Sequence, residues 1–394
     1  MRRNPRQARG IDMKDITLAN NRYGDDKVFD GCSIFGVMDT SGAAIPADVA
    51  IRAIDLMRDR DNGLGGGFAA YGLYPEHEDS YAFHIMYVSK EGQRTTEEYL
   101  GEWFDIEKSE LMDVDPTVVD NPPLMQRYFM TLKTDKLAGS DPLQYVADKT
   151  MYVNNFIPDS FVFSGGKNMG VFKGVGHPYH IAKFFRLEQY SGYLWTAHGR
   201  FPTNTPGWWG GAHPFSLLDW TVVHNGEISS YGINKRFLEQ YGYVCSLQTD
   251  TEVVAYAVDL LVRRHNLPME VAARVLAAPF WNELQYLDPA EAEMMTALRM
   301  TYGGLLLNGP FTIIVGSTGE MVGLTDRIRL RPLVVGTAGS KVFLSSEESA
   351  MRLVCLELED AWIPVGGQPV IARMGKIPTQ EDTLNPREVF AGAH

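Results

Sequence analysis

Four short stretches of this chain carry the side chains most suited to chemistry: a cysteine, an arginine, an asparagine–glycine pair and an aspartate. The cysteine is Cys32, which follows Gly31 and begins an apolar run ending at Met38. A cysteine in such a run is usually only a small hydrophobic residue. Cleavage before Cys32 would free an α-amine with a pKa of about 8, which can act as the base for the neighbouring thiol. We therefore predict that residues 1–31 are a removable leader and that Cys32 is a nucleophile.

Arg200 and Asp250 could together hold a small zwitterion. Arg200 follows an apolar strand, and its guanidinium can bind a carboxylate through two parallel hydrogen bonds. Asp250 can neutralise an ammonium group. Each residue also has a plain structural interpretation: Arg200 as a solvated strand end, and Asp250 as a first-turn acid within the capping box formed by Thr249 and Glu252.

The pair Asn225–Gly226 has two interpretations as well. Asn-Gly after an apolar strand is a strong hairpin signal. The same pair can offer a side-chain amide and a backbone N–H to an oxyanion, and one such donor contributes about 2.7–4 kcal/mol to catalysis. The local sequence favours the turn, although a tight turn would also mount the two donors rigidly.

Three other motifs are interpreted as structural. The glycine-rich stretch 65–70 fits a dinucleotide motif only formally, because a helical pattern precedes it where a strand is required. Residues 165–168 lack the glycine offset and the Ser or Thr of a phosphate loop, so we predict a turn. His177 and His180 flank a proline and have no third ligand nearby, which argues against a metal site.

The pattern along the rest of the chain alternates between strand and helix. Apolar residues at helical spacing predict a helix over 49–57, and polar, Ala- and Glu-rich stretches predict helical insertions over 95–150 and 267–298. Short apolar runs predict strands at 32–38, 82–88, 193–197, 218–223, 311–315, 321–324 and 341–344.

Composition narrows the class of function. The chain has 394 residues and a net charge of −13, which disfavours nucleic-acid binding. Three cysteines without paired spacing suggest neither disulfides nor a metal cluster. We find no signal peptide and no apolar run long enough for a membrane span, so a cytoplasmic location is expected.

Taken together and in their order, the motifs resemble class II glutamine amidotransferases. The motifs are Cys32–Gly36, His198–Thr205, His224–Ile228, Thr249–Glu252 and Ser345–Glu347. The resemblance covers residues 32–360, between the leader and a predicted C-terminal tail at 361–394. The segment from Arg200 to Ile228 is most similar to the glutaminase domain of glutamate synthases.

This resemblance implies the α+β fold of N-terminal-nucleophile hydrolases, a four-layer αββα sandwich of two antiparallel sheets, here with helical insertions. It also implies autocatalytic removal of the leader and hydrolysis of glutamine to glutamate and ammonia through a thioester. The implied roles are nucleophile for Cys32, oxyanion donors for Asn225 and Gly226, and glutamine binding for Arg200, Thr203 and Asp250.

The resemblance further implies a partner. The expected partner is a synthase subunit carrying FMN and an iron–sulfur centre, which would receive the ammonia in a hetero-oligomer, while this chain itself would hold no cofactor. An N-methylglutamate synthase subunit would have nearly the same sequence pattern. A non-catalytic scaffold subunit would be favoured if the leader stays attached. A general amidase fits less well, since its substrates lack the zwitterion that Arg200 and Asp250 suit.

Overall fold

The computed structural model describes residues 31–137, 139–201 and 207–383. Its larger core sheet has seven antiparallel strands in the order β17-β15-β16-β1-β10-β3-β8. The strands are β1 (Ser33–Asp39), β3 (Gly66–Tyr71), β8 (Met169–Gly174), β10 (Leu194–Gly199), β15 (Val334–Ala338), β16 (Lys341–Ser345) and β17 (Asp360–Trp362). The strand that follows Cys32 is therefore central, and it is buried along its whole length.

The second core sheet has five antiparallel strands in the order β11-β12-β13-β14-β18. They are β11 (Phe215–Leu217), β12 (Trp220–Gly226), β13 (Phe311–Ser317), β14 (Glu320–Thr325) and β18 (Val370–Arg373). The two sheets contact each other through β1 and β10 on one side and β12 and β13 on the other.

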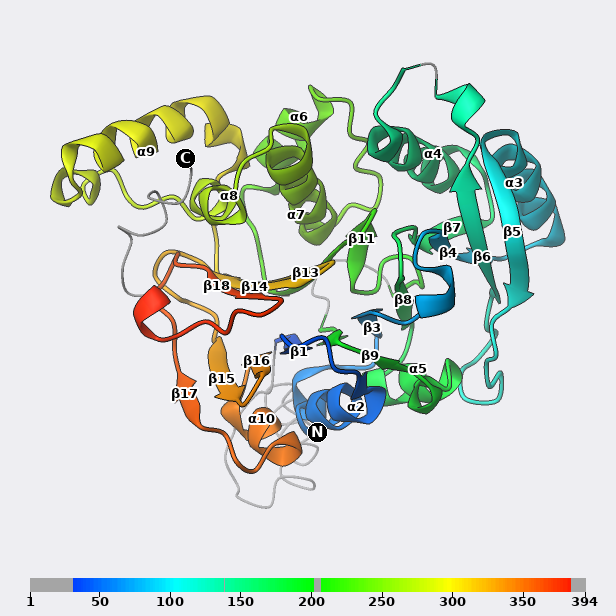
Figure 1. Cartoon of the computed structure of the whole chain (residues 1–394), viewed down its shortest axis with the longest axis horizontal. Helices are drawn as coiled ribbons and strands as arrows, with labels where there is room; N and C mark the ends of the chain where they lie inside the picture. Colours follow the sequence, from blue (N-terminus) through cyan, green and yellow to red (C-terminus); the bar gives the residue numbers. More distant parts are fainter. Residues whose placement is uncertain (1–30, 138, 202–206, 384–394) are drawn as a thin grey trace, which may run out of the picture. The chain divides into compact units, whose positions relative to one another are not determined.

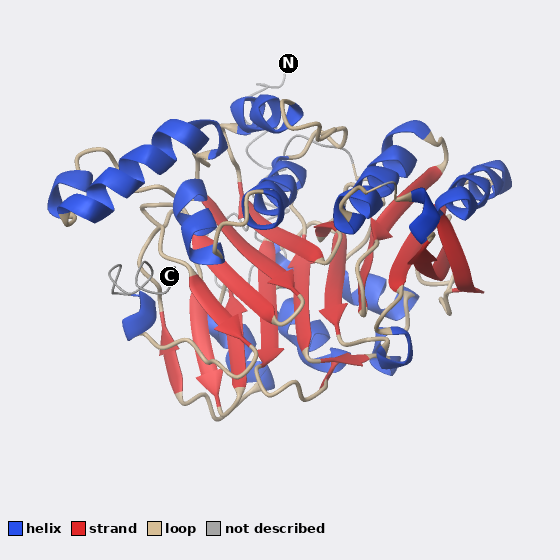
Figure 2. Ribbon diagram, turned by 45° about the horizontal axis from the view of Figure 1, so that its top comes forward, coloured by secondary structure: helices blue, strands red, loops and turns tan. Residues whose placement is uncertain are grey.

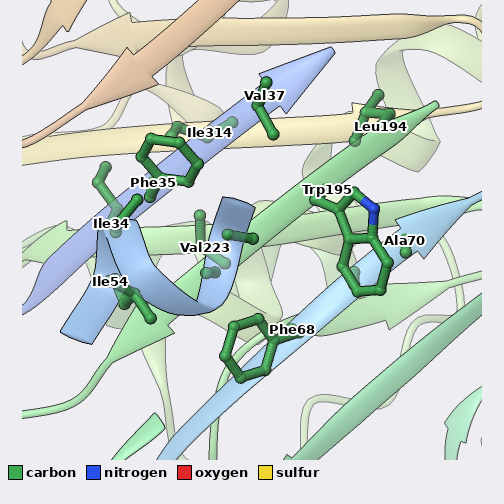
Figure 3. Packing of buried hydrophobic residues seen from close by; sticks show 14 of the residues in the cluster. Ile34, Phe35, Val37, Ile54, Phe68, Ala70, Leu194, Trp195, Val223 and Ile314 are labelled. Atoms are coloured by element: carbon green, nitrogen blue, oxygen red, sulfur yellow. The ribbon is translucent and has the colours of Figure 1, made fainter. Parts of the chain in front are cut away.

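Apolar side chains from both sheets fill the space between them, as Figure 3 shows for Val37, Val223 and Ile314. Gly36 of β1 permits the close approach, because a Cβ at this position would lie 2.8 Å from the sulfur of Met321 and 3.3 Å from Ile314. Interiors are packed without spare volume, so a larger residue here would push the sheets apart.

Helices cover both outer faces (Figure 1), which confirms the predicted four-layer αββα fold class. The helices α2 (Ala47–Leu56), α5 (Pro178–Phe184) and α10 (Glu348–Val354) lie on the seven-stranded sheet. On the other side, α7 (Asp250–Val258) packs on β11 and β12, and α6 (Tyr231–Glu239) packs on α7. The helix predicted at 49–57 is α2, whose buried residues recur at helical spacing: Ala47, Ala50, Ala53 and Ile54.

A third sheet lies beside the core, in the order β5-β6-β4-β7. Its strands are β4 (Tyr81–Tyr87), β5 (Phe104–Leu111), β6 (Leu124–Leu132) and β7 (Ser160–Ser164), and its helices are α3 (Lys90–Trp103) and α4 (Pro142–Phe156). Figure 2 shows the strands in red, and within this sheet β4 and β7 contact β8 and β11 of the core sheets. The all-helical interpretation of 95–150 is therefore wrong for β5 and β6. The reason lies in β5, an edge strand whose polar residues are mostly exposed and show no strand period.

The other predicted insertion is helical. It contains α8 (Met269–Leu276) and α9 (Pro289–Tyr302), where the Asp288 side chain caps α9 by accepting hydrogen bonds from two backbone N–H groups. A short pair, β2 (Ile45–Pro46) and β9 (Ser191–Gly192), completes the strands of the described residues. The interpretation of residues 361–394 as a tail needs correction, because β18 pairs with β14 inside the second sheet.

Candidate active site

The pairing of β1 with β10 places the predicted nucleophile beside the predicted carboxylate-binding residue. Ser33 pairs with Gly199 in antiparallel register, so Cys32 and Arg200 continue the two strands side by side. The backbone N–H of Phe201 donates to the sulfur of Cys32 at 3.4 Å. The Nε of Arg60 donates to the Cys32 carbonyl at 3.3 Å, which fixes the start of β1.

Burial raises the pKa of the Cys32 thiol above its usual 9.0, although the Phe201 N–H and the positive charges of Arg200 and Arg331 act in the opposite direction. The sulfur is therefore a neutral thiol at pH 7 and needs a base before it can attack. While Cys32 is joined to Gly31, its nitrogen is an amide and cannot serve as that base.

Arg200 is almost fully buried, with 5% of its surface exposed. Its N–H donates to Gly65 at 2.9 Å, and its carbonyl accepts from Asn62 at 3.2 Å, so the glycine-rich loop holds its backbone. Burial lowers the pKa of the guanidinium, while the thiol of Cys32 and the carboxylate of Asp250 oppose that shift. The interpretation of Arg200 as a solvated strand end is wrong.

Asp250 is the first residue of α7 and also connects that helix to the end of β12. Its carboxylate accepts the N–H of Ile228 at 2.9 Å and lies 3.4 Å from Nδ1 of His224. Burial alone would raise the pKa of Asp250, but His224 and the hydrogen bonds outweigh it and hold the pKa below the usual 3.8. A negative charge is thus maintained on a partly buried side chain that is close enough to Arg200 and Cys32 to influence the pKa of both.

The predicted capping box is only half present. Thr249 is the N-cap and accepts the N–H of Thr251 at 3.3 Å. Glu252 instead accepts the N–H groups of Ser246 and Leu247, at 3.3 and 2.9 Å. Asp250 therefore combines a helix-end position with contacts that a simple cap does not need.

Asn225 and Gly226 lie inside β12 and pair with Thr312 and Phe311 of β13, so the hairpin interpretation is wrong. Asn225 is fully buried, and its Nδ2 donates to Ser346 at 3.4 Å. Gly226 has a φ of 143°, and a Cβ there would lie 2.0 Å from the carbonyl oxygen of Pro310. Only glycine fits this position. Thr203, the remaining predicted site residue, lies outside the described residues.

Three buried histidines, His198, His213 and His224, lie next to the site, and their contacts with one another could not be predicted from the motifs that contain two of them. The rings of His198 and His213 stack with centroids 3.9 Å apart. His198 bonds the His224 carbonyl at 2.9 Å, and His213 bonds the Thr251 hydroxyl at 2.8 Å. Burial lowers the pKa of His198 to about 3, so its ring is neutral and adds no charge beside the guanidinium of Arg200.

Of the other predicted structural motifs, the glycine-rich stretch touches the site only through Gly65, whose carbonyl accepts the N–H of Arg200. The stretch 66–71 is β3, and 165–168 joins β7 to β8 as a turn. His177 pairs with Asp61. Within the ranges the structure describes, no group of three or more His, Cys, Asp or Glu residues is placed to hold a metal ion. In the same part of the chain, no helix has the length and apolar character needed to cross a bilayer.

Comparison with known proteins agrees with this geometry. Residues 94–359 match the family model described as class II glutamine amidotransferases, and the chain belongs to that family. An uncharacterized protein of Archaeoglobus fulgidus is 54% identical over 355 residues, which is 89% of this chain and 94% of that protein. A putative glutamine amidotransferase of Methanothermobacter thermautotrophicus is 27% identical, over 82% of this chain and 93% of that protein.

A solved structure of glutamine phosphoribosylpyrophosphate amidotransferase from B. subtilis is one of the similar structures. The similarity has a TM-score of 0.46 at 15% identity and covers 90% of this chain and 50% of that one. The match spans only half of that enzyme.

Proposed function

We propose that this chain is the glutaminase subunit of a glutamate-synthase-type enzyme and that it delivers ammonia to a separate synthase subunit. The observation that supports the glutaminase assignment is the pairing that brings Cys32 beside Arg200, with Asp250 close enough to influence the pKa of both and Asn225 next to Gly31. This set offers one group for each part of glutamine.

Arg200 and Asp250 would bind the α-carboxylate and the α-ammonium of glutamine. Arg200 is buried and Asp250 is partly buried, so a bound zwitterion would offset the cost of holding these unlike charges away from water. The side-chain carboxamide of the substrate would then extend towards Cys32.

The reaction would proceed in two steps once Cys32 has a free α-amine. The sulfur forms a bond to the carboxamide carbon, and the thiol proton passes through the α-amine to the departing nitrogen, which leaves as ammonia. Water then attacks the γ-glutamyl thioester, which releases glutamate and restores the thiol. Asn225 and Gly226 would hold the negative oxygen in both steps.

The synthase assignment is the finer part of the proposal and rests on the similarity of residues 200–228 to glutamate synthases. The partner would hold FMN and an iron–sulfur centre and would use 2-oxoglutarate as the ammonia acceptor. Ammonia delivery to an N-methylglutamate synthase subunit is the alternative that the site itself does not separate, since both would use the same glutaminase.

Two measurements test the proposal. Purified chain whose sequence begins at Cys32 should release glutamate from glutamine, and Cys32→Ala should release none and keep its leader. Affinity purification from the native source should bring down a flavin-containing protein, and that complex, supplied with a two-electron reductant, should form two glutamates from one 2-oxoglutarate and one glutamine. A complex that consumes methylamine and leaves 2-oxoglutarate unused would refute the synthase assignment.

A further inference from the structure

The carboxamide of Asn225 lies between Ser346 and the residue before the nucleophile. Its Nδ2 donates to Ser346, while its buried Oδ1 has no hydrogen-bond partner among the described residues. This oxygen faces Gly31, 3.9 Å from the position that a Cβ on Gly31 would occupy. In this orientation an acceptor points towards the start of β1, and an acceptor would repel an oxyanion instead of binding it.

Ser346 makes a second contact that reaches β1. Its hydroxyl oxygen accepts the N–H of Ile34 at 3.2 Å, and Ile34 lies two residues after Cys32. Because the N–H of Ile34 and Nδ2 of Asn225 both donate to the oxygen of Ser346, its hydroxyl hydrogen takes part in neither bond. Buried polar groups are nearly always paired, yet this arrangement leaves the hydroxyl hydrogen of Ser346 and the amide oxygen of Asn225 without a hydrogen-bond partner.

A half-turn of the Asn225 amide lets the unused hydroxyl hydrogen of Ser346 and the unpaired oxygen of Asn225 bond to each other. Oxygen and nitrogen of an amide have the same shape, so the rotation exchanges them without moving other atoms. Ile34 then still donates to Ser346, the hydroxyl of Ser346 donates to Oδ1 of Asn225, and Nδ2 faces Gly31 and the start of β1. The Ser346 hydroxyl and the Asn225 oxygen are then paired with each other, and Nδ2 is the group left without a partner in the described residues, which leaves its N–H groups for an oxyanion.

We propose that Ser346 is a positioning residue that sets the amide of Asn225 with its N–H groups towards the substrate. The inference rests on the proposed function and deepens it. Ser346 would not touch glutamine and would act only through Asn225. Because Ile34 belongs to β1 and Asn225 to β12, the same three groups also tie the strand of the nucleophile to the strand of the oxyanion donor.

The test is a double-mutant cycle with glutamate release as the assay. Ser346→Ala should lower kcat at least about tenfold and leave KM within about twofold, since the lost donor acts on the transition state. Asn225→Ala should lower kcat by about 10²–10³-fold. The double variant should be no slower than Asn225→Ala alone, because a residue acting only through Asn225 has nothing left to position.

Two variants control for folding. Ser345→Ala removes the neighbouring buried hydroxyl, which contacts Met57 and the N–H of Glu347, and should leave kcat unchanged. Ser346→Thr keeps the hydroxyl and should retain most of the wild-type rate. Losses that multiply in the double variant, an unchanged kcat in Ser346→Ala, or a folded Ser346→Thr as slow as Ser346→Ala would each overturn the inference. Wild-type chain that begins at Cys32 and releases no glutamate would overturn the proposed function and this inference with it.

Discussion

Asp250→Asn separates glutamine binding from helix capping. The change removes one negative charge but keeps the shape and an oxygen that can still accept the N–H of Ile228. A hydrogen bond to a charged group is worth about 1.5–3 kcal/mol, and each 1.4 kcal/mol is tenfold in affinity, so loss of the ammonium contact should raise the KM for glutamine about 10- to 150-fold. Stability at pH 7 should fall by about 1 kcal/mol or less, the value of a first-turn charge at a helix end.

Thr249→Ala is the matched control, because it removes the N-cap of the same helix and leaves the carboxylate of Asp250 in place. It should cost about 1 kcal/mol of unfolding free energy with no change in KM. The assays are glutamate release over a range of glutamine concentrations and urea unfolding of each variant. If Asp250→Asn unfolds more easily by 2 kcal/mol or more on the urea scale while its KM stays at the wild-type value, the binding role is refuted.

The pH dependence of the stability of Asp250→Asn gives an independent check on the charge of Asp250. The folded-state pKa of Asp250 lies below 3.8, so its charge contributes stability above that pH, and the contribution is lost as the pH falls through the folded pKa. The stability difference between wild type and Asp250→Asn should therefore shrink as the pH falls below about 4. A difference that stays constant down to pH 2 would contradict the assigned shift.

Three further predictions concern neighbouring residues. Burial raises the pKa of Glu252 to about 7, so its ionisation destabilises the folded state as the pH rises from its usual 4.5 through 7. The free energy of unfolding of Glu252→Gln, measured with urea and relative to wild type, should accordingly rise by at most about 3 kcal/mol from pH 5 to pH 8. An equal stability difference at both pH values would contradict this. Gly226→Ala should fail to form soluble, folded protein, since its Cβ would overlap the carbonyl of Pro310; a folded, active variant would show that β12 can shift. In uncleaved chain, iodoacetamide should alkylate Cys32 faster as the pH rises to 9 without reaching a plateau, because the thiol pKa is raised, and a plateau near pH 7 would refute that.

The sequence predicted the elements whose patterns are local. The runs that became β1, β10 and β13 are short and apolar, and α2 has its small apolar residues at helical spacing. The strand β5 was missed because an exposed edge strand carries little hydrophobic signal. The strand β18 was missed because its pairing with β14 is a long-range contact, which a local sequence pattern does not predict.

For the site, sequence reasoning identified residue types and could not give their distances. The register of β1 on β10 places Cys32 beside Arg200, although 168 residues separate them in the chain. The hairpin interpretation of Asn225–Gly226 was wrong because the partner strand β13 comes from residues 311–317, far beyond the expected turn. Ser346 belongs to a motif of the resemblance, but only its contacts with β1 and β12 suggest a role for its hydroxyl.

The central claim is that Cys32 becomes a terminal residue whose thiol attacks a glutamine-like substrate. Peptide mass mapping after incubation with 6-diazo-5-oxo-L-norleucine, a reactive glutamine analogue, tests it directly. We expect one adduct, on a peptide that begins at Cys32, which excess glutamine prevents from forming, while the half-buried Cys355 stays unmodified. An intact Gly31–Cys32 bond, or labelling of Cys355 equal to that of Cys32, would contradict the account.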